Sequence, residues 1–309
     1  MPDRQRGQCV STPWRGIFAI QQTPFDAAGN LVWADFEREA YFIARSGAHG
    51  FVWPVMASEF TVVSAEERLQ GMRLAVSTVS KRAPVVIGVA ETSTSGAMRF
   101  AAEAARCGAD GVIAMPPWAA KMGSPALLAN YYRAIAEASG LPVIIQNADG
   151  PLGSSLSAKH VTEICSSIPG VWYVKEEKNP QGHSVSELIN HKCAAIRGVF
   201  SGASAVYLVP EHRRGVCGNM PGCVLPDVDA RLWNLLEAGN ARRWLQSHPG
   251  LLPDRVAADA PGSGRRRPLR RHAGLERVPV CLHHDLARQP DDHPGRPVDD
   301  DHRRCCALG

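Results

Sequence analysis

The chain has 309 residues, enough for one large domain or two small ones, and 45% of them are hydrophobic. A formal net charge of +4 is too small to indicate a nucleic-acid-binding surface. No apolar stretch approaches the roughly twenty residues that a membrane-spanning helix needs, and residues 1–10 lack the apolar core of a secretory signal. We therefore expect a cytoplasmic protein with neither nucleic-acid nor membrane partners.

Nine cysteines are scattered along the chain without a Cys-x-x-Cys pair or a zinc-like spacing with histidine. No combination of histidines and carboxylates suggests a metal site either. We expect no metal and no cofactor.

Short apolar runs alternate with helical segments from the first strand to about residue 245. The apolar runs predict strands at residues 16–21, 50–55, 84–90, 111–115, 142–147, 171–175, 195–200 and 215–220. Helical patterning predicts helices at residues 33–46, 65–80, 95–107, 125–138, 157–166, 184–193, 204–213 and 227–245.

Strands that are apolar throughout are typical of a parallel sheet covered by helices on its outer face. Eight strand–helix units in this length predict a (β/α)8 TIM barrel. An open, doubly wound sheet is the alternative fold. It usually has a glycine-rich phosphate turn after its first strand, and residues 22–25 (QTPF) are no such turn.

In a (β/α)8 barrel the chemistry lies at the carboxyl ends of the strands. Lys175 ends the apolar run at residues 171–174 and is followed by Glu176 and Glu177. Burial disfavours the charged form of a lysine and leaves an amine that can attack a carbonyl. The position indicates a Schiff-base lysine, and a lysine that turns outward to solvent is the alternative.

Six motifs near the predicted strands share a common resemblance. They are GIFAIQQTPFDAAGN, VMASEF followed by SAEER, MPPW, PVIIQN, YVKEE and FSGAS. In this order and spacing they resemble the dihydrodipicolinate synthase and N-acetylneuraminate lyase superfamily over about residues 14–252. The resemblance implies class I aldolase-type chemistry, in which Lys175 condenses with the ketone of a small 2-oxo acid. It also implies a homodimer or a homotetramer.

The end of the fifth strand departs from the family pattern. Family members generally carry a tyrosine that shuttles protons there, and this chain has Gln146. An amide cannot ionise near neutral pH and so cannot act as a general base. Retro-aldol cleavage needs such a base, whereas loss of the hydroxyl as water needs an acid. We therefore take Gln146 as a catalytic candidate that favours dehydration.

The loop after the second strand also departs from the pattern, because it lacks the family's paired threonines. Its sequence is Met56-Ala57-Ser58-Glu59. We expect Ala57 and Ser58 to bind the substrate carboxylate through backbone N–H groups and the serine hydroxyl. Glu59 is a candidate for moving protons in a desolvated mouth, or alternatively a loop carboxylate that caps backbone N–H groups.

Two further strand ends complete the expected site, with Asn147 and Gly202 as substrate-binding candidates. The segments IIQNADGPLGSSLSA and AMPPW most resemble the 2-keto-3-deoxy-L-arabonate dehydratase branch of the superfamily. That resemblance implies dehydration of a 2-keto-3-deoxy sugar acid. Aldolase or synthase chemistry of the same superfamily stays open, as does a non-catalytic sugar-acid-binding remnant.

The composition changes abruptly near residue 253, where arginine, proline, histidine and aspartate replace the apolar residues. Such a segment cannot bury a core and reads as disordered. We expect residues 1–252 to form the barrel and residues 253–309 to be a low-complexity or frameshifted tail, so that the family's C-terminal helical extension is missing or corrupted. A nucleic-acid-binding tail is the alternative, but interleaved aspartates nearly cancel its arginines.

Overall fold

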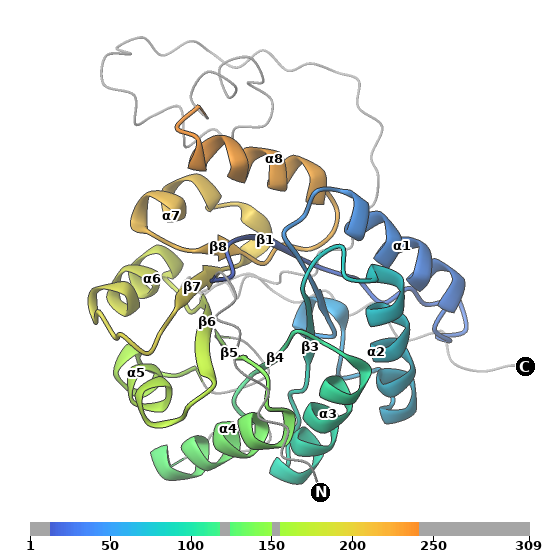
Figure 1. Ribbon diagram of the computed structural model, residues 1–309, viewed down its shortest axis with the longest axis horizontal. Helices are drawn as coiled ribbons and strands as arrows, with labels where there is room; N and C mark the ends of the chain where they lie inside the picture. The colour runs from blue at the N-terminus through green and yellow to red at the C-terminus, as the bar shows by residue number, and fades with distance from the viewer. Residues whose placement is uncertain (1–12, 118–123, 150–154, 241–309) are drawn as a thin grey trace, which may run out of the picture. The chain divides into compact units, whose positions relative to one another are not determined.

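Eight parallel strands close into a single barrel in the chain order β1 to β8 (Figure 1). The computed structural model describes residues 13–117, 124–149 and 155–240. The strands are β1 Gly16–Ile20, β2 Gly50–Trp53, β3 Val85–Gly88, β4 Gly111–Ala114, β5 Val143–Ala148, β6 Val171–Glu177, β7 Gly198–Ser201 and β8 Gly218–Asn219. The predicted (β/α)8 barrel is confirmed, and the open sheet is wrong because β1 pairs with β8.

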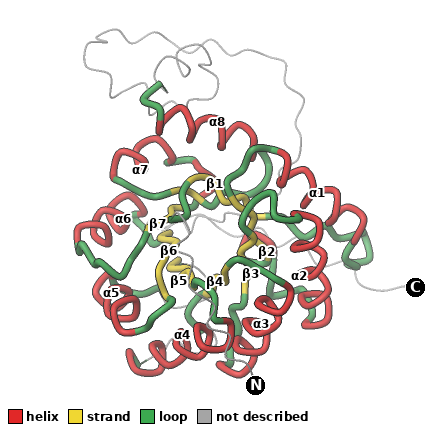
Figure 2. Tube along the Cα trace, viewed as in Figure 1, coloured by secondary structure: helices red, strands yellow, loops and turns green. Residues whose placement is uncertain are grey.

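The helices surround the barrel (Figure 2). They are α1 Trp33–Arg45, α2 Ala65–Val79, α3 Thr94–Cys107, α4 Pro125–Ser139, α5 Ala158–Ser167, α6 Gln181–Asn190, α7 Leu208–Arg214 and α8 Pro226–Glu237, with two 3-10 turns, η1 Met56–Ser58 and η2 Ala203–Ala205. Several begin at a serine whose side chain accepts a hydrogen bond from the first turn. Ser64 and Glu67 form a complete capping box at the start of α2.

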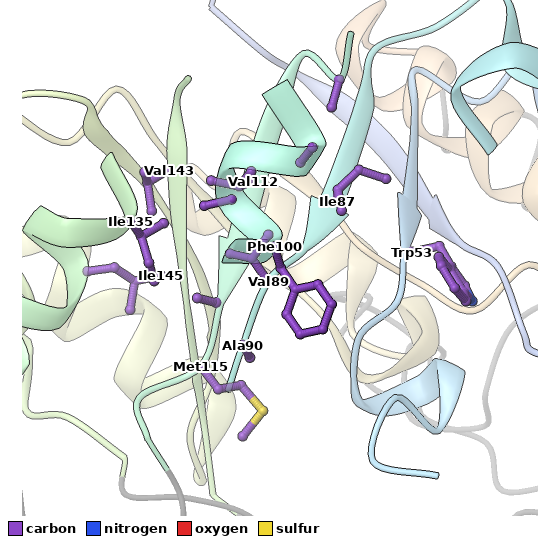
Figure 3. Packing of buried hydrophobic residues seen from close by; sticks show 14 of the residues in the cluster. Trp53, Ile87, Val89, Ala90, Phe100, Val112, Met115, Ile135, Val143 and Ile145 are labelled. Atoms are coloured by element: carbon purple, nitrogen blue, oxygen red, sulfur yellow. The ribbon is translucent and has the colours of Figure 1, made fainter. Parts of the chain in front are cut away.

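Side chains alternate between two apolar layers because successive residues of a strand point to opposite faces. Phe18, Val86, Ile144 and Phe200 are among the side chains that pack together inside the barrel. Their chain neighbours pack between the sheet and the helices; Figure 3 shows part of this outer layer, where strand residues such as Ile87 pack near Phe100 of α3. The interior cluster fills the barrel beneath the strand ends, so the reactive groups lie at its carboxyl face.

Several predicted elements have clearly different bounds in the structure. Strand β6 runs two residues beyond Lys175, and β7 and β8 each start three residues later than predicted. Helix α8 ends at Glu237, eight residues before its predicted end. Helix α6 starts three residues earlier. The predicted helix at residues 204–213 begins instead with η2, and the α-helix starts at Leu208. The bounds of β6 and η2 matter most, because both elements form the site described below.

The predicted tail, residues 253–309, lies outside the described residues, so its expected disorder and the boundary at residue 252 stay proposals. No helix within the described ranges is both long enough and apolar enough to cross a membrane.

Candidate active site

Strands β5 and β6 lie side by side and extend together at the carboxyl face (Figure 1). Their final residues pair in register as Gln146 with Lys175, Asn147 with Glu176, and Ala148 with Glu177. Tyr173 belongs to the interior cluster, and the alternation of a strand therefore places Lys175 and Glu177 on that same inner side. Glu176 faces the other way.

Lys175 is buried, with a side chain that is 3% exposed, and its partner is a carboxylate. Its Nζ lies 2.7 Å from Glu177 Oε2. The same oxygen accepts a hydrogen bond of 3.2 Å from Nε2 of Gln146. The structure thus brings two predicted catalytic residues, Lys175 and Gln146, together around Glu177.

Glu177 is held from its other side by the corner between β7 and η2. Its Oε1 accepts a hydrogen bond of 3.4 Å from the backbone N–H of Ala203. A Cβ atom added to Gly202 would lie 1.9 Å from the same oxygen. Gly202 was predicted as a substrate-binding residue, and in the structure its lack of a side chain makes room for Glu177.

Glu177 is the central residue that reasoning from the sequence did not assign to the site. Its signal was present in the spacing, because residues two apart on a strand share a face. It was overlooked because the predicted strand ended at Lys175, whereas β6 continues to Glu177.

The outward-facing pair at these strand ends has a structural role. Asn147 Nδ2 donates to Glu176 Oε2 at 2.8 Å and to the backbone oxygen of Leu156 at 3.0 Å. Asn147 Oδ1 accepts from the Leu156 N–H at 2.7 Å. Burial raises the pKa of Glu176, and the hydrogen bond from Asn147 opposes this rise. The expected substrate contact of Asn147 is not supported, because protein groups on the outer side of the sheet occupy its amide.

The loop after β2 places its candidates in two different environments. The Ser58 side chain is buried, and its Oγ donates a hydrogen bond of 2.6 Å to the backbone oxygen of Gln21. Ala57 and Glu59 are exposed. Glu59 has a left-handed backbone, and its carboxylate has no hydrogen bond or ion pair within the described residues. The desolvated surroundings expected for Glu59 are therefore wrong.

The described ranges contain no group of three or more histidine, cysteine, aspartate or glutamate side chains placed to hold a metal ion. The site consists of an amine, a carboxylate and a carboxamide at neighbouring strand ends. Such a set can form an imine with a ketone and move a proton beside it.

The model of the Dihydrodipicolinate synthetase family matches residues 13–239 of this chain. The chain belongs to this family. Its members are lyases and synthases that act on small molecules. The superfamily expected from the six motifs is thereby confirmed.

Relatives within the dihydrodipicolinate synthetase family carry several activities. The chain is 30% identical over 220 residues to L-2-keto-3-deoxyarabonate dehydratase of Azospirillum brasilense, covering 70% of this chain and 71% of that protein. It is 27% identical over 241 residues to 4-hydroxy-tetrahydrodipicolinate synthase of Rhizobium meliloti, covering 78% and 81%. It is 30% identical over 168 residues to the probable 2-dehydro-3-deoxy-D-pentonate aldolase of Escherichia coli, covering 54% and 56%.

Solved structures of the family share the fold. The prophage protein YagE of Escherichia coli K12, solved in complex with pyruvate, superposes with a TM-score of 0.70 at 23% identity, covering 77% of this chain and 80% of that one. At this identity the likeness concerns the barrel alone.

Proposed function

We propose that the protein is a class I, Schiff-base lyase that dehydrates a 2-keto-3-deoxy sugar acid. The observation that carries this proposal is the contact between Lys175 and Glu177, with Gln146 bonded to the same carboxylate oxygen. The similarity to L-2-keto-3-deoxyarabonate dehydratase supports a pentonate of this type as the substrate.

In the first step, Glu177 takes a proton from the Lys175 ammonium and frees the amine. The amine attacks the C2 ketone, and Glu177 returns its proton to the carbinolamine hydroxyl, which leaves as water and gives a protonated imine beside the restored Glu177 carboxylate. Lys175 is buried beside a single carboxylate partner, which holds its Nζ in one place. Holding a nucleophile in place removes part of the entropic cost of the reaction.

In the second step, a carboxylate removes a proton from C3 and an enamine forms. The enamine electrons expel the C4 hydroxyl, which leaves as water when an acid protonates it. We assign both transfers to Glu177, which accepts the C3 proton and then returns it to the hydroxyl. The new C3–C4 double bond then shifts to C4–C5 as a proton leaves C5 and one is added at C3, and the resulting C5 enol tautomerises to the aldehyde. Hydrolysis of the imine restores Lys175, so the substrate loses one water in total.

Gln146 supports dehydration over cleavage. Carbon–carbon cleavage begins with loss of the proton from the C4 hydroxyl, for which the family has a phenol at this position. An amide supplies no such base. Its Nε2 donates to Glu177 instead, which orients the carboxylate.

A pentonate aldolase activity is the second candidate, favoured by the similarity to the E. coli aldolase. Product analysis separates the two reactions. The protein is supplied with a 2-keto-3-deoxypentonate, and 2-oxoglutarate semialdehyde and pyruvate are measured separately. The semialdehyde supports the proposal, and pyruvate as the main product contradicts it. If borohydride traps no 2-oxo acid on the protein, the non-catalytic binder is supported.

We also propose a homodimer or homotetramer. Exposed apolar side chains on the described surface support it, namely Val206, Tyr207, Val224 and Leu225. Light scattering of the purified chain tests this.

A further inference from the structure

Glu211, on α7, is a buried carboxyl group that the proposed reaction does not use. Its side chain is 0% exposed. Neither carboxyl oxygen has a hydrogen-bond partner that meets normal geometry within the described residues. Glutamate is almost never fully buried unless it is paired, because an isolated carboxylate is costly to remove from water.

Three polar side chains lie in the same layer outside the barrel. Ser201 and Gln181 lie next to the Glu211 carboxyl group. Asn219 joins the group through Nδ2, which donates to Ser201 Oγ at 2.8 Å. All three are buried, with exposures from 0% to 6%.

The donors and acceptors of this layer fit a neutral carboxyl group. Asn219 Oδ1 is a buried acceptor without a donor in the described residues, and Gln181 Nε2 is a buried donor without an acceptor there. A carboxylate only accepts hydrogen bonds and supplies no donor to this layer. A carboxylic acid supplies one O–H donor and keeps an acceptor for Gln181.

The same layer supports the active site. Asn219 Nδ2 donates a second hydrogen bond, of 2.9 Å, to the backbone oxygen of Gly202. Gly202 and Ala203 form the corner that contacts Glu177. A chain of contacts therefore runs from Glu211 through Ser201 and Asn219 to Glu177.

We propose that Glu211 is a buried neutral acid that completes a hydrogen-bond network with Gln181, Ser201 and Asn219, and that this network positions the corner that holds Glu177. Glu211 is a positioning residue, because it acts on the reaction through Glu177. The structural part of the proposal is independent of the lyase reaction, and its catalytic consequence rests on the proposed function.

The surroundings of Glu211 shift its pKa in both directions. Burial raises the pKa of Glu211 to about 7. The neighbouring polar groups of Ser201 and Gln181 and the charge of Arg214 oppose this rise, and the carboxylate of Glu177 adds to it. Loss of the proton above this pH removes the O–H donor and places a second negative charge behind Glu177. We expect the corner at residues 202–205 to loosen and imine formation to slow on the alkaline side.

The first test detects the proton directly. Infrared difference spectra of the full chain between pH 5 and pH 9, recorded for the wild type and Glu211→Gln, show whether a protonated carboxyl band belongs to this residue. We expect a band that titrates near pH 7 in the wild type and is absent from the variant. A wild type without such a band at pH 6 overturns the proposal, even if the variant fails to fold.

The second test measures the corner and the reaction. The protection factors of the amides at residues 202–205, which correct for the intrinsic pH dependence of exchange, and cyanoborohydride trapping of pyruvate are followed against pH, each variant being compared with its own value at pH 6. Above pH 7 we expect protection to fall in the wild type and in Glu187→Gln, an exposed α6 control, but not in Glu211→Gln, and we expect trapping to fall more in the first two than in Glu211→Gln. The same alkaline change in Glu211→Gln overturns the proposal.

The two proposals fail in different ways. A chain that traps no 2-oxo acid, yet shows the infrared band and the exchange difference, refutes the lyase and keeps the network. A chain that traps pyruvate but shows neither the infrared band nor the exchange difference keeps the lyase proposal and refutes the network.

Discussion

Glu177 lies so close to Gly202 that position 202 has no room for a side chain. A Cβ at position 202 would meet Glu177 Oε1 at 1.9 Å and Cδ at 2.5 Å. Both distances are far below van der Waals contact, so the carboxylate or the corner at residue 202 must move when a methyl group is added.

Gly202→Ala is therefore expected to slow imine trapping of pyruvate by about a hundredfold, the usual effect of an ångström-scale displacement of a catalytic group. The control is Gly222→Ala at the next strand end, where the new Cβ meets its nearest atom, Gln22 Nε2, at 3.5 Å. Equal trapping by both variants would contradict the assigned role of Gly202.

Lys175→Ala is expected to abolish reductive trapping, because within the described ranges Lys175 is the lysine that pairs with Glu177 beside Gln146. Mass spectrometry after reduction with pyruvate measures the adduct. Lys159→Ala, on the exposed face of α5, is the control and should trap normally. An adduct on Lys178 or Lys192 would show that the wrong lysine was assigned.

Glu177→Gln keeps the shape of the side chain but removes the group that moves the proton. Dehydration is expected to fall by about 10²–10⁴-fold, the usual contribution of general acid–base catalysis. Steady-state formation of the semialdehyde measures it. The control is Glu176→Gln, which faces the outer layer and bonds to Asn147. Glu176→Gln should lower the melting temperature more than the rate. A larger loss of dehydration rate in Glu176→Gln than in Glu177→Gln would refute the catalytic role assigned to Glu177.

Glu211 also predicts how the stability changes with pH. Its pKa rises from 4.5 in the unfolded chain to about 7 in the folded one, so the folded state keeps the proton longer. The free energy of unfolding is then unaffected below pH 4.5 and falls between pH 4.5 and 7. Each pKa unit corresponds to about 1.4 kcal/mol, so the loss is about 3 kcal/mol above pH 7. Urea unfolding should show this fall in the wild type and a flatter profile in Glu211→Gln.

Glu237 is expected to change the stability with pH in the opposite direction from Glu211, because its contribution to the free energy of unfolding is lost at acid pH. Hydrogen bonds from Arg15 at 2.5 and 2.8 Å, aided by His212, lower the pKa of Glu237 to about 2. This stabilisation is present above pH 4.5 and is lost as the pH falls towards 2. Both side chains are partly exposed, so it is worth about 1 kcal/mol. Arg15→Gln should destabilise the protein by that amount at pH 7 and much less at pH 2. Arg38→Gln, which removes an exposed pair with Asp35, should change little at either pH.

The barrel was predictable from the sequence because its strands are continuous apolar runs and half of its eight α-helices begin at serine caps. The bounds that were wrong depend on tertiary contacts. Residues 203–205 (ASA) have ordinary helical preferences, yet all three adopt positive φ values. The hydrogen bond from the Ala203 N–H to Glu177 lies at this turn, and a contact between two distant strand ends overrides local preference there.

The candidate site was predictable only in part, and for a similar reason. Lys175 and Gln146 could be found because their strands were found. The side-chain directions in loops could not be predicted, which is why Glu59 was expected in a desolvated mouth and is exposed. Asn147 was assigned to the substrate because it ends a strand, although strand alternation already placed it opposite Gln146.

The close fit at Gly202 ties two distant positions of the chain to one another. A carboxylate at position 177 requires glycine at position 202, because any other residue would fill its place. The pattern Lys-x-Glu followed 25 residues later by glycine, as read here from residues 175, 177 and 202, is therefore a test that can be applied to any aligned sequence of the family. Chains that keep both residues would share the acid beside the lysine, and a chain that loses one is expected to have lost the other.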